Sequence, residues 1–101
     1  EQTGFEVRAT IVHIDNFGNC ILNLSSEKWS TRIKDAAVLK FPGMDSEIPV
    51  HPVSSYAQLA DSSTGILKSS QGFLELALNQ KSCAEAYNLG IGDRLGIVLQ
   101  E

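Results

Sequence analysis

Four side chains able to bind a small molecule lie close together near the start of the chain. They are Asp15, Phe17, Asn19 and Asn23, within the stretch HIDNFGNCILNL at 13–24. A carboxylate accepts hydrogen bonds from an ammonium group, and an asparagine offers the paired donor and acceptor that can read the edge of a purine. A phenylalanine ring offers a face on which a base can stack, an interaction of about 1–3 kcal/mol per base. These residue types are those of a site for a small polar ligand.

The same residues also have a purely structural interpretation. Asp and Asn side chains in tight turns hydrogen-bond their own backbone, so Asp15 and Asn19 would then only stabilise a bend around Gly18. Tyr56 supplies a second aromatic face, far along the chain. Residue types alone leave both the ligand interpretation and the turn interpretation open.

Residues that would carry out catalysis are sparse. His13 and His51 have no neighbouring partner in the sequence that would build a metal site. The chain lacks the GxSxG and HExxH motifs and a phosphate-binding glycine loop. The GIGD segment at 90–93 follows a helical pattern, so we interpret it as a turn. Taken alone, the residues indicate a binding module without a metal more than an enzyme.

Size and charge limit the possible classes of protein. A chain of 101 residues and 11.0 kDa corresponds to one domain with a core of its own. The net charge of −4 and the pI near 5.0 argue against a general nucleic-acid binder, which needs a basic face for the phosphates. They are compatible with a small neutral or zwitterionic ligand.

The redox and membrane signals of the sequence are weak. Cys20 and Cys83 are the two cysteines, without CxxC spacing. Reduced structural thiols are the favoured interpretation, although the spacing leaves a disulfide open. Neither an apolar run near the roughly 20 residues of a membrane span nor a signal peptide is visible, so we expect a cytoplasmic protein that does not enter the membrane.

Short strands separated by turn residues dominate the pattern, which is typical of a barrel or sandwich. The proline-containing segment 47–53 is expected at a sheet edge, because proline cannot donate a ladder hydrogen bond. Ser82 and Glu85 form a capping box for one helix at 82–90, with Gly90 as its C′ residue. Segment 25–33 suits a short helical turn or loop capped by Ser25 or Ser26.

The predicted strands are 5–14, 20–24, 36–41, 47–53, 66–68, 73–79 and 93–100. The fold class predicted is all-β, a closed antiparallel barrel of about seven strands with one short helix.

The order of several motifs resembles a known family. The blocks GFEVRATIVHIDNFGNCILNL, YAQLADSSTG and SSQGFLELALNQKSCAEAYNLGIGDRLGIVL occur in this order and span nearly the whole chain. Together they resemble the C-terminal domain of the S-adenosylmethionine hydroxide adenosyltransferases, relatives of the bacterial fluorinase and chlorinase. The DxFGN motif is suggestive by itself, and the second block at the right distance makes the resemblance fairly specific.

The resemblance implies a larger enzyme. Residues 1–101 would be the C-terminal barrel of a longer two-domain chain, and the first residues EQTGF, without a methionine, fit that expectation. In the family, the N-terminal domain of one subunit and the barrel of its neighbour in a trimer enclose S-adenosylmethionine. Water or hydroxide attacks the ribose C5′ and methionine leaves, giving adenosine. S-adenosylmethionine is the substrate, and no cofactor is implied.

The resemblance also assigns roles to residues of this chain. Asp15 matches the carboxylate that holds the methionine ammonium, and Ser70 matches a serine at the methionine carboxylate. Phe17 and Asn19 match adenine-site residues, and Tyr56 matches an aromatic beside the adenine. The segment around Asn79 and Gln80 would offer main-chain groups to the adenine edge. Gln71 and Leu78 stand where the fluorinase has arginines, which argues against fluorinase-like activity and for a different carboxylate clamp.

Three functions follow as hypotheses. The first is the adenosine-binding half of an enzyme that cleaves S-adenosylmethionine with water or hydroxide, inactive as an isolated domain. The second is a non-catalytic barrel that binds a nucleotide or another small ligand, and the third is a trimerisation domain. If the pocket is shared between subunits, the rings of Phe17 and Tyr56 should be partly exposed in the single domain.

Overall fold

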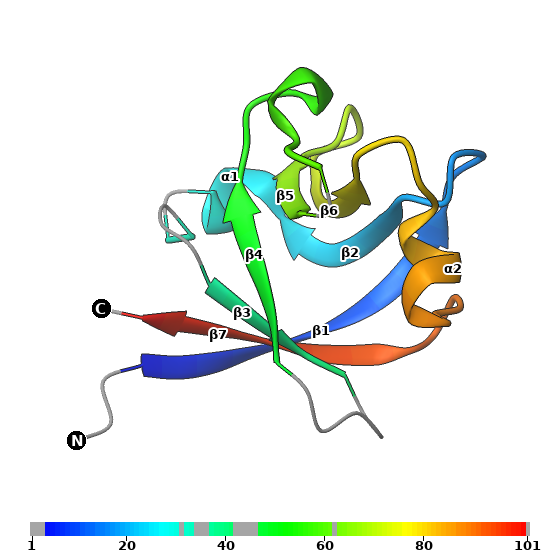
Figure 1. The fold of residues 1–101 in the computed structure, drawn as a ribbon. Coiled ribbons are helices and arrows are strands. Elements are labelled where there is room, and N and C mark those ends of the chain that lie inside the picture. Colours follow the sequence, from blue (N-terminus) through cyan, green and yellow to red (C-terminus); the bar gives the residue numbers. More distant parts are fainter. Residues whose placement is uncertain (1–3, 31, 34–36, 42–46, 62, 101) are drawn as a thin grey trace.

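The computed structural model describes residues 4–30, 32–33, 37–41, 47–61 and 63–100. Their strands curve around one apolar interior, and short helical segments lie in the connections (Figure 1). The strands are β1 (Gly4–Ile14), β2 (Cys20–Ser25), β3 (Ala37–Lys40), β4 (Ile48–Pro52), β5 (Thr64–Lys68), β6 (Phe73–Leu78) and β7 (Arg94–Gln100). The helices are α1 (Ser26–Trp29), α2 (Cys83–Tyr87) and the 3₁₀ helix η1 (Tyr56–Gln58).

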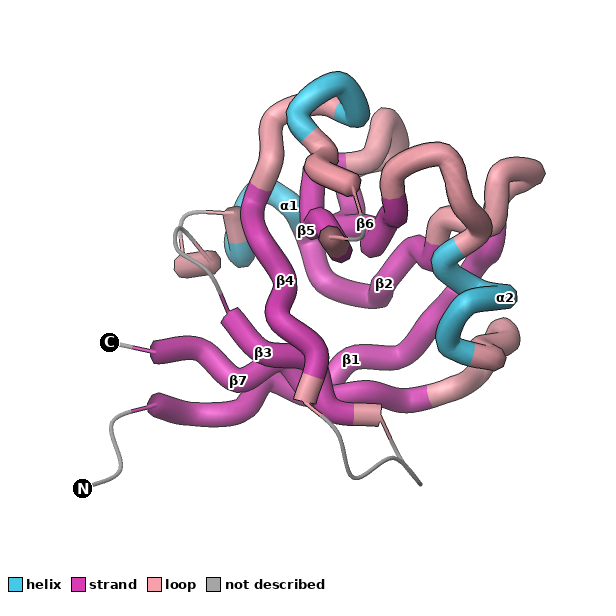
Figure 2. Tube along the Cα trace, in the orientation of Figure 1, coloured by secondary structure: helices cyan, strands magenta, loops and turns pink. Residues whose placement is uncertain are grey.

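The strands close into a barrel in the order β1-β2-β6-β5-β4-β3-β7, and β7 pairs back onto β1 (Figure 2). This confirms the predicted closed seven-stranded barrel. One pair differs from the prediction, because β4 and β5 run parallel while the other described pairs are antiparallel. A parallel pair needs a crossover connection, and the connection that contains η1 provides it. The barrel is therefore mixed and carries two short α-helices where the sequence predicted one.

The predicted edge position of segment 47–53 is wrong. The strand β4 pairs with β3 on one side and with β5 on the other, so it lies inside the closed sheet. Each of these two ladders is short, and Val50 is the residue that pairs on both sides, with Ala37 and Thr64. Proline loses its donor but keeps its carbonyl acceptor, so Pro49 and Pro52 shorten the ladders without opening the barrel.

The interior consists of side chains from alternate positions of the strands. The largest fully buried apolar side chains belong to Ile11, Leu22, Leu39, Val50, Leu76 and Ile97. Such alternation follows from the period-two geometry of strands, which turns every second side chain inward. Cys20 and Cys83 are both fully buried and free, in agreement with the favoured interpretation of reduced thiols.

A second, smaller apolar cluster lies outside the barrel wall. Leu59, from the connection after β4, packs with Leu67 and Ala77 on the outer face of β5 and β6. A Cβ atom on Gly65 would come within 2.3 Å of the Leu59 side chain, so only glycine lets Leu59 lie this close to the strand. This contact fixes the segment that presents Tyr56.

The helix α2 begins as predicted and ends differently. Ser82 is its N-cap and accepts a hydrogen bond from the Glu85 N–H at 3.1 Å. The left-handed residue at its end is Asn88 (φ 56°), not Gly90, so the predicted C-terminal position of Gly90 is wrong. Asparagine is the residue that most readily replaces glycine in this conformation. None of the helices in the described part of the chain is long and apolar enough to cross a membrane.

Candidate binding cleft

The loop between β1 and β2 is organised by one carboxylate. Oδ1 of Asp15 accepts hydrogen bonds from the backbone N–H groups of Phe17 (2.9 Å) and Asn19 (3.0 Å). Oδ2 accepts one from the side-chain amide of Asn19 at 3.1 Å. The structural interpretation of Asp15 and Asn19 as turn-forming residues is thus confirmed. The same bonds also fix the Phe17 backbone and the Asn19 amide.

Gly18 holds this loop against the start of α2. Its φ of +84° is a left-handed conformation, and a Cβ atom there would lie 1.9 Å from the Ser82 hydroxyl oxygen and 2.8 Å from the Ser82 Cα. Its carbonyl accepts a hydrogen bond from the Ala84 N–H at 2.9 Å. Glycine is therefore required both by the backbone angle and by the close approach of the two segments.

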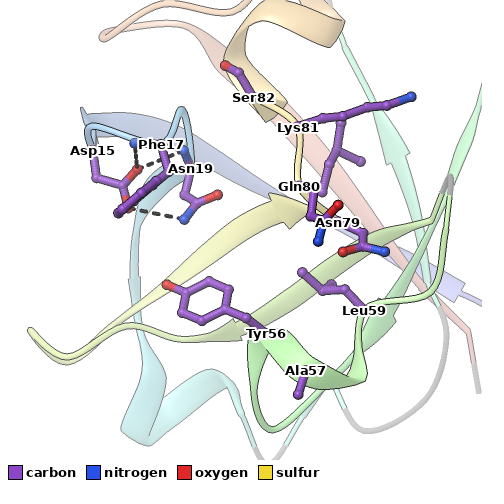
Figure 3. Close-up of a pocket in the computed structure, with 11 residues that line it drawn as sticks. Asp15, Phe17, Asn19, Tyr56, Ala57, Leu59, Asn79, Gln80, Lys81 and Ser82 are labelled. Atoms are coloured by element: carbon purple, nitrogen blue, oxygen red, sulfur yellow. Dashed lines mark hydrogen bonds between the residues drawn. The ribbon is translucent and has the colours of Figure 1, made fainter.

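A cleft of about 780 Å³ opens between this loop, the η1 segment and the chain that follows β6 (Figure 3). Figure 3 shows Phe17 and Asn19 on one side of it, Asn79 and Gln80 opposite, and Tyr56 below. Predicted site residues that line it are Asp15, Phe17, Asn19, Tyr56, Asn79 and Gln80. Residues of the lining that sequence analysis did not anticipate are Ala57, Leu59, Lys81 and Ser82, together with Leu78, which had been singled out only as a replaced arginine.

Ser70 is the predicted site residue that this cleft does not include. It lies in the turn between β5 and β6, where Ser69 bonds the turn backbone, and it is not part of the lining. The cleft thus brings together the residues assigned to the adenine and to the methionine ammonium. The serine assigned to the methionine carboxylate lies outside it.

The two aromatic residues of the cleft, Phe17 and Tyr56, are accessible, whereas the Asn19 amide is buried. Phe17 is 78% exposed and Tyr56 is 52% exposed, so the expectation that both rings are partly exposed is confirmed. Asn19 is only 6% exposed, and its amide nitrogen is bonded to Asp15. A ligand would meet two open aromatic surfaces and one fixed amide at the cleft wall.

A buried carboxyl group stands behind Tyr56. Glu75 of β6 is 2% exposed, and its Oε2 accepts a hydrogen bond from the Tyr56 hydroxyl at 2.5 Å. Burial raises the pKa of Glu75. Burial and the bond to Glu75 together raise the pKa of Tyr56 to about 12, so the phenol stays protonated and donates. Sequence analysis missed Glu75, although one charged residue inside the apolar run FLELAL was a signal of it.

The opposite wall is a tight turn after β6. Gln80 adopts a left-handed backbone (φ 57°), and Leu78 and Lys81 form an isolated bridge across it. The amide nitrogen of Asn79 donates to Asp61 Oδ1 at 2.7 Å. That side-chain donor is therefore engaged within the protein, whereas the side chains of Gln80 and Lys81 are exposed at the cleft.

The arrangement has the chemistry of a binding site. The lining combines aromatic faces, amides, the Asp15 carboxylate and the exposed Lys81 ammonium, a set that suits a planar, polar or zwitterionic molecule. Histidine and cysteine are missing from the described lining, so none of its hydroxyl groups has a histidine base. Within the part of the chain that is described, no three metal-ligating side chains gather.

Fold and cleft together define the class of the protein: a small closed barrel with a polar cleft outside its wall, made from three loops. The chain belongs to the family of the SAM hydroxide adenosyltransferase C-terminal domain, which it matches over residues 9–96. SAM is S-adenosylmethionine, and the resemblance stated from the sequence motifs is thereby confirmed.

Solved structures share this fold. A crystal structure of an uncharacterized conserved protein from Thermotoga maritima superposes with a TM-score of 0.78 at 21% identity, over 91% of this chain and 35% of that one. One of a conserved hypothetical protein from Thermus thermophilus gives a TM-score of 0.64 at 23% identity, over 89% of this chain and 34% of that one. The chain therefore spans about a third of the length of these proteins.

Proposed function

We propose that the cleft binds the adenosine part of S-adenosylmethionine. In this proposal the barrel is the ligand-holding part of an enzyme that cleaves S-adenosylmethionine with water or hydroxide to adenosine and methionine. The observation that carries it is the convergence of Asp15, Phe17, Asn19, Tyr56 and the 79–80 turn on one cleft of about 780 Å³. That volume falls within the range of small-molecule sites.

The residues of the cleft fit distinct parts of such a ligand. Phe17 and Tyr56 would stack with the base or cover its face, and Asn19 would meet its polar edge with the amide atoms left over from the bond to Asp15. A carboxylate has about four acceptor positions, and the loop occupies three at Asp15. The remaining lone pair is the one that would accept from the methionine ammonium.

The openness of the cleft supports a second protein surface over it. Rings as exposed as Phe17 and Tyr56 mark a surface that binds a partner or a ligand. We propose that an N-terminal domain, of the same chain or of a neighbouring subunit in a homotrimer, closes the cleft and supplies the groups that assist the attack.

One observation favours a second candidate function. The Asp15 carboxylate is bonded mainly to its own loop, and the described lining contains no histidine that could act as a base for its hydroxyl groups. A non-catalytic nucleoside-binding barrel would have these features as well. The two candidates share the ligand and differ in turnover, so a measurement of products separates them.

Binding is tested by two asparagine variants of the native protein that carries this chain. Asn19→Ala should weaken adenosine binding by about 1–3 kcal/mol, because it leaves polar groups of the ligand and of Asp15 unpaired. Asn23→Ala is the matched control: Asn23 lies on β2, and its Oδ1 accepts from the Thr10 N–H at 2.8 Å, away from the cleft lining. It should lower the melting temperature and leave the affinity unchanged.

Isothermal titration calorimetry with adenosine, beside thermal melts of both variants, gives the answer. If the wild-type protein does not bind adenosine, or if Asn19→Ala binds it as tightly as the wild type, the proposed site is wrong and the loop is only a turn.

A further inference from the structure

Glu75 places a buried carboxyl group in the otherwise apolar strand β6. In β6, Leu74 and Leu76 point into the core, so Glu75 points to the outer face of the barrel wall. Its neighbours across the sheet are Ile21 of β2 and Leu67 of β5, both apolar and buried. Yet Glu75 is only 2% exposed. A buried carboxyl among apolar side chains is costly unless a polar group satisfies it.

The group that satisfies it belongs to the cleft. The Tyr56 hydroxyl donates to Glu75 Oε2 at 2.5 Å. Burial raises the pKa of Glu75, and the hydrogen bond from Tyr56 acts in the opposite direction and favours the carboxylate. Asp15 is the other titratable group that acts on both residues. The acceptor oxygen of Glu75 and the orientation of the Tyr56 ring are therefore coupled.

Tyr56 is held at two separate points. Its backbone begins η1, where the Leu59 N–H donates to the Tyr56 carbonyl at 3.1 Å, and Leu59 itself packs over Gly65. Its hydroxyl is fixed by Glu75. Between these points the residue is 52% exposed. A half-exposed side chain without the second anchor would populate several rotamers, and ligand binding would then include the entropic cost of ordering it.

We propose that Glu75 is a positioning residue for the ligand: by accepting the Tyr56 hydroxyl bond, it holds the Tyr56 ring as a preformed wall of the cleft. The proposal rests on the proposed function, since it concerns the same cleft. Glu75 would thus contribute to affinity although it does not line the cleft itself. Preorganised groups of this kind raise affinity because the cost of ordering them is met on folding.

Three variants separate positioning from simple stability. Tyr56→Phe keeps the ring and removes the donor, and Glu75→Leu removes the acceptor. Glu75→Gln keeps an acceptor oxygen and removes the charge. The loss of one hydrogen bond corresponds to a weakening of adenosine binding by roughly 3- to 10-fold, which we expect for Tyr56→Phe and for Glu75→Leu. The double variant should be no weaker than either single variant, and Glu75→Gln should bind within about 2-fold of the wild type.

A ligand-free readout accompanies the affinities. Three-bond couplings of the β-protons at position 56, measured by nuclear magnetic resonance, report whether χ1 is fixed or averaged. We expect one rotamer in the wild type and in Glu75→Gln, and averaged couplings in Tyr56→Phe. A purely stabilising hydrogen bond would lower the melting temperature in these variants and leave the affinity for adenosine unchanged.

The outcomes distinguish the two proposals. No adenosine binding by the wild type overturns the proposed function, whatever the couplings are. Normal binding by Tyr56→Phe, or additive losses in the double variant, overturns the positioning role while the binding site stands. If Glu75→Leu does not fold, Tyr56→Phe and Glu75→Gln decide the question alone, because both keep the volume of the side chain nearly unchanged.

Discussion

At the scale of single residues, most acceptor positions of the Asp15 carboxylate are occupied by hydrogen bonds from its own loop. Three hydrogen bonds converge on it, two from backbone N–H groups and one from Asn19. A charged acceptor bonded in this way stabilises a loop more than a neutral one does. A ligand that needs this carboxylate therefore meets a group that folding has already oriented.

Replacing Asp15 should accordingly destabilise the loop between β1 and β2. Asp15→Ala is expected to lower the free energy of unfolding by about 2–3 kcal/mol, because two backbone donors and the Asn19 amide lose their acceptor. Asp93→Ala is the control, since the Asp93 carboxylate accepts one bond in its turn, from the Gly90 N–H at 2.8 Å, and its loss should cost about 1 kcal/mol. Urea denaturation of both variants measures the difference. Equal losses would mean that the Asp15 bonds add nothing beyond an ordinary turn.

At the residue level, the structure brings most of the side chains predicted from the sequence to one cleft, and their role in binding stays a prediction. Asp15, Phe17 and Asn19 were selected because their side chains offer an acceptor, a stacking face and a paired donor and acceptor, and because they share the DxFGN motif. Glu75 was missed, since its role depends on Tyr56, a residue distant in the sequence. Ser70 was assigned by resemblance alone, and the barrel does not place it in the cleft lining.

At the scale of elements, the cleft depends on how the β1–β2 loop meets α2. Gly18→Ala should destabilise the protein strongly, because it adds a clash with the Ser82 backbone to an unfavourable left-handed angle. Gly72→Ala is a close control: its φ is +90°, and nothing lies within 4 Å of an added Cβ. It should cost about 1 kcal/mol, the backbone penalty by itself, and Gly18→Ala about 2 kcal/mol more.

Thermal melts and adenosine titrations of the two glycine variants test this junction. The loss of affinity should accompany Gly18→Ala only, since the loop carries Phe17 and Asn19 into the cleft. If both variants lose the same stability, the contact between Gly18 and Ser82 is not a constraint on the fold.

The strands were predictable from the sequence because their signal is local. β-Branched and aromatic residues and the turn signals between short apolar segments predicted β1, β2, β6 and β7 to within a residue or two. The parallel pairing of β4 and its place inside the barrel were not predictable, because closure is decided by partners far apart in the chain. The helix end at Asn88 instead of Gly90 is a smaller failure of the same kind, in which the loop bonds after α2 select one of two suitable residues.

At the scale of the whole molecule, the barrel is closed and its cleft is open. The pairing of β1 with β7 completes the sheet, so the fold leaves no strand edge for a partner among the described strands. The exposed rings of Phe17 and Tyr56 are where a further surface could bind. The closed sheet thus provides stability, the loops around the cleft provide a surface for recognition, and we expect any catalysis to require a further surface over the cleft.

The final prediction concerns turnover. The 101-residue chain alone should bind adenosine and not hydrolyse S-adenosylmethionine, because rate acceleration requires groups positioned around the reacting carbon, and the described cleft lining provides no hydroxyl paired with a histidine base. The native protein that carries the chain should release adenosine and methionine in equal amounts. Chromatography of both products, measured against the concentration of each protein, separates the enzyme from the non-catalytic barrel. Turnover that follows the concentration of the isolated chain would contradict this assignment of catalysis to what covers the cleft, and binding without turnover in the native protein would favour the non-catalytic module.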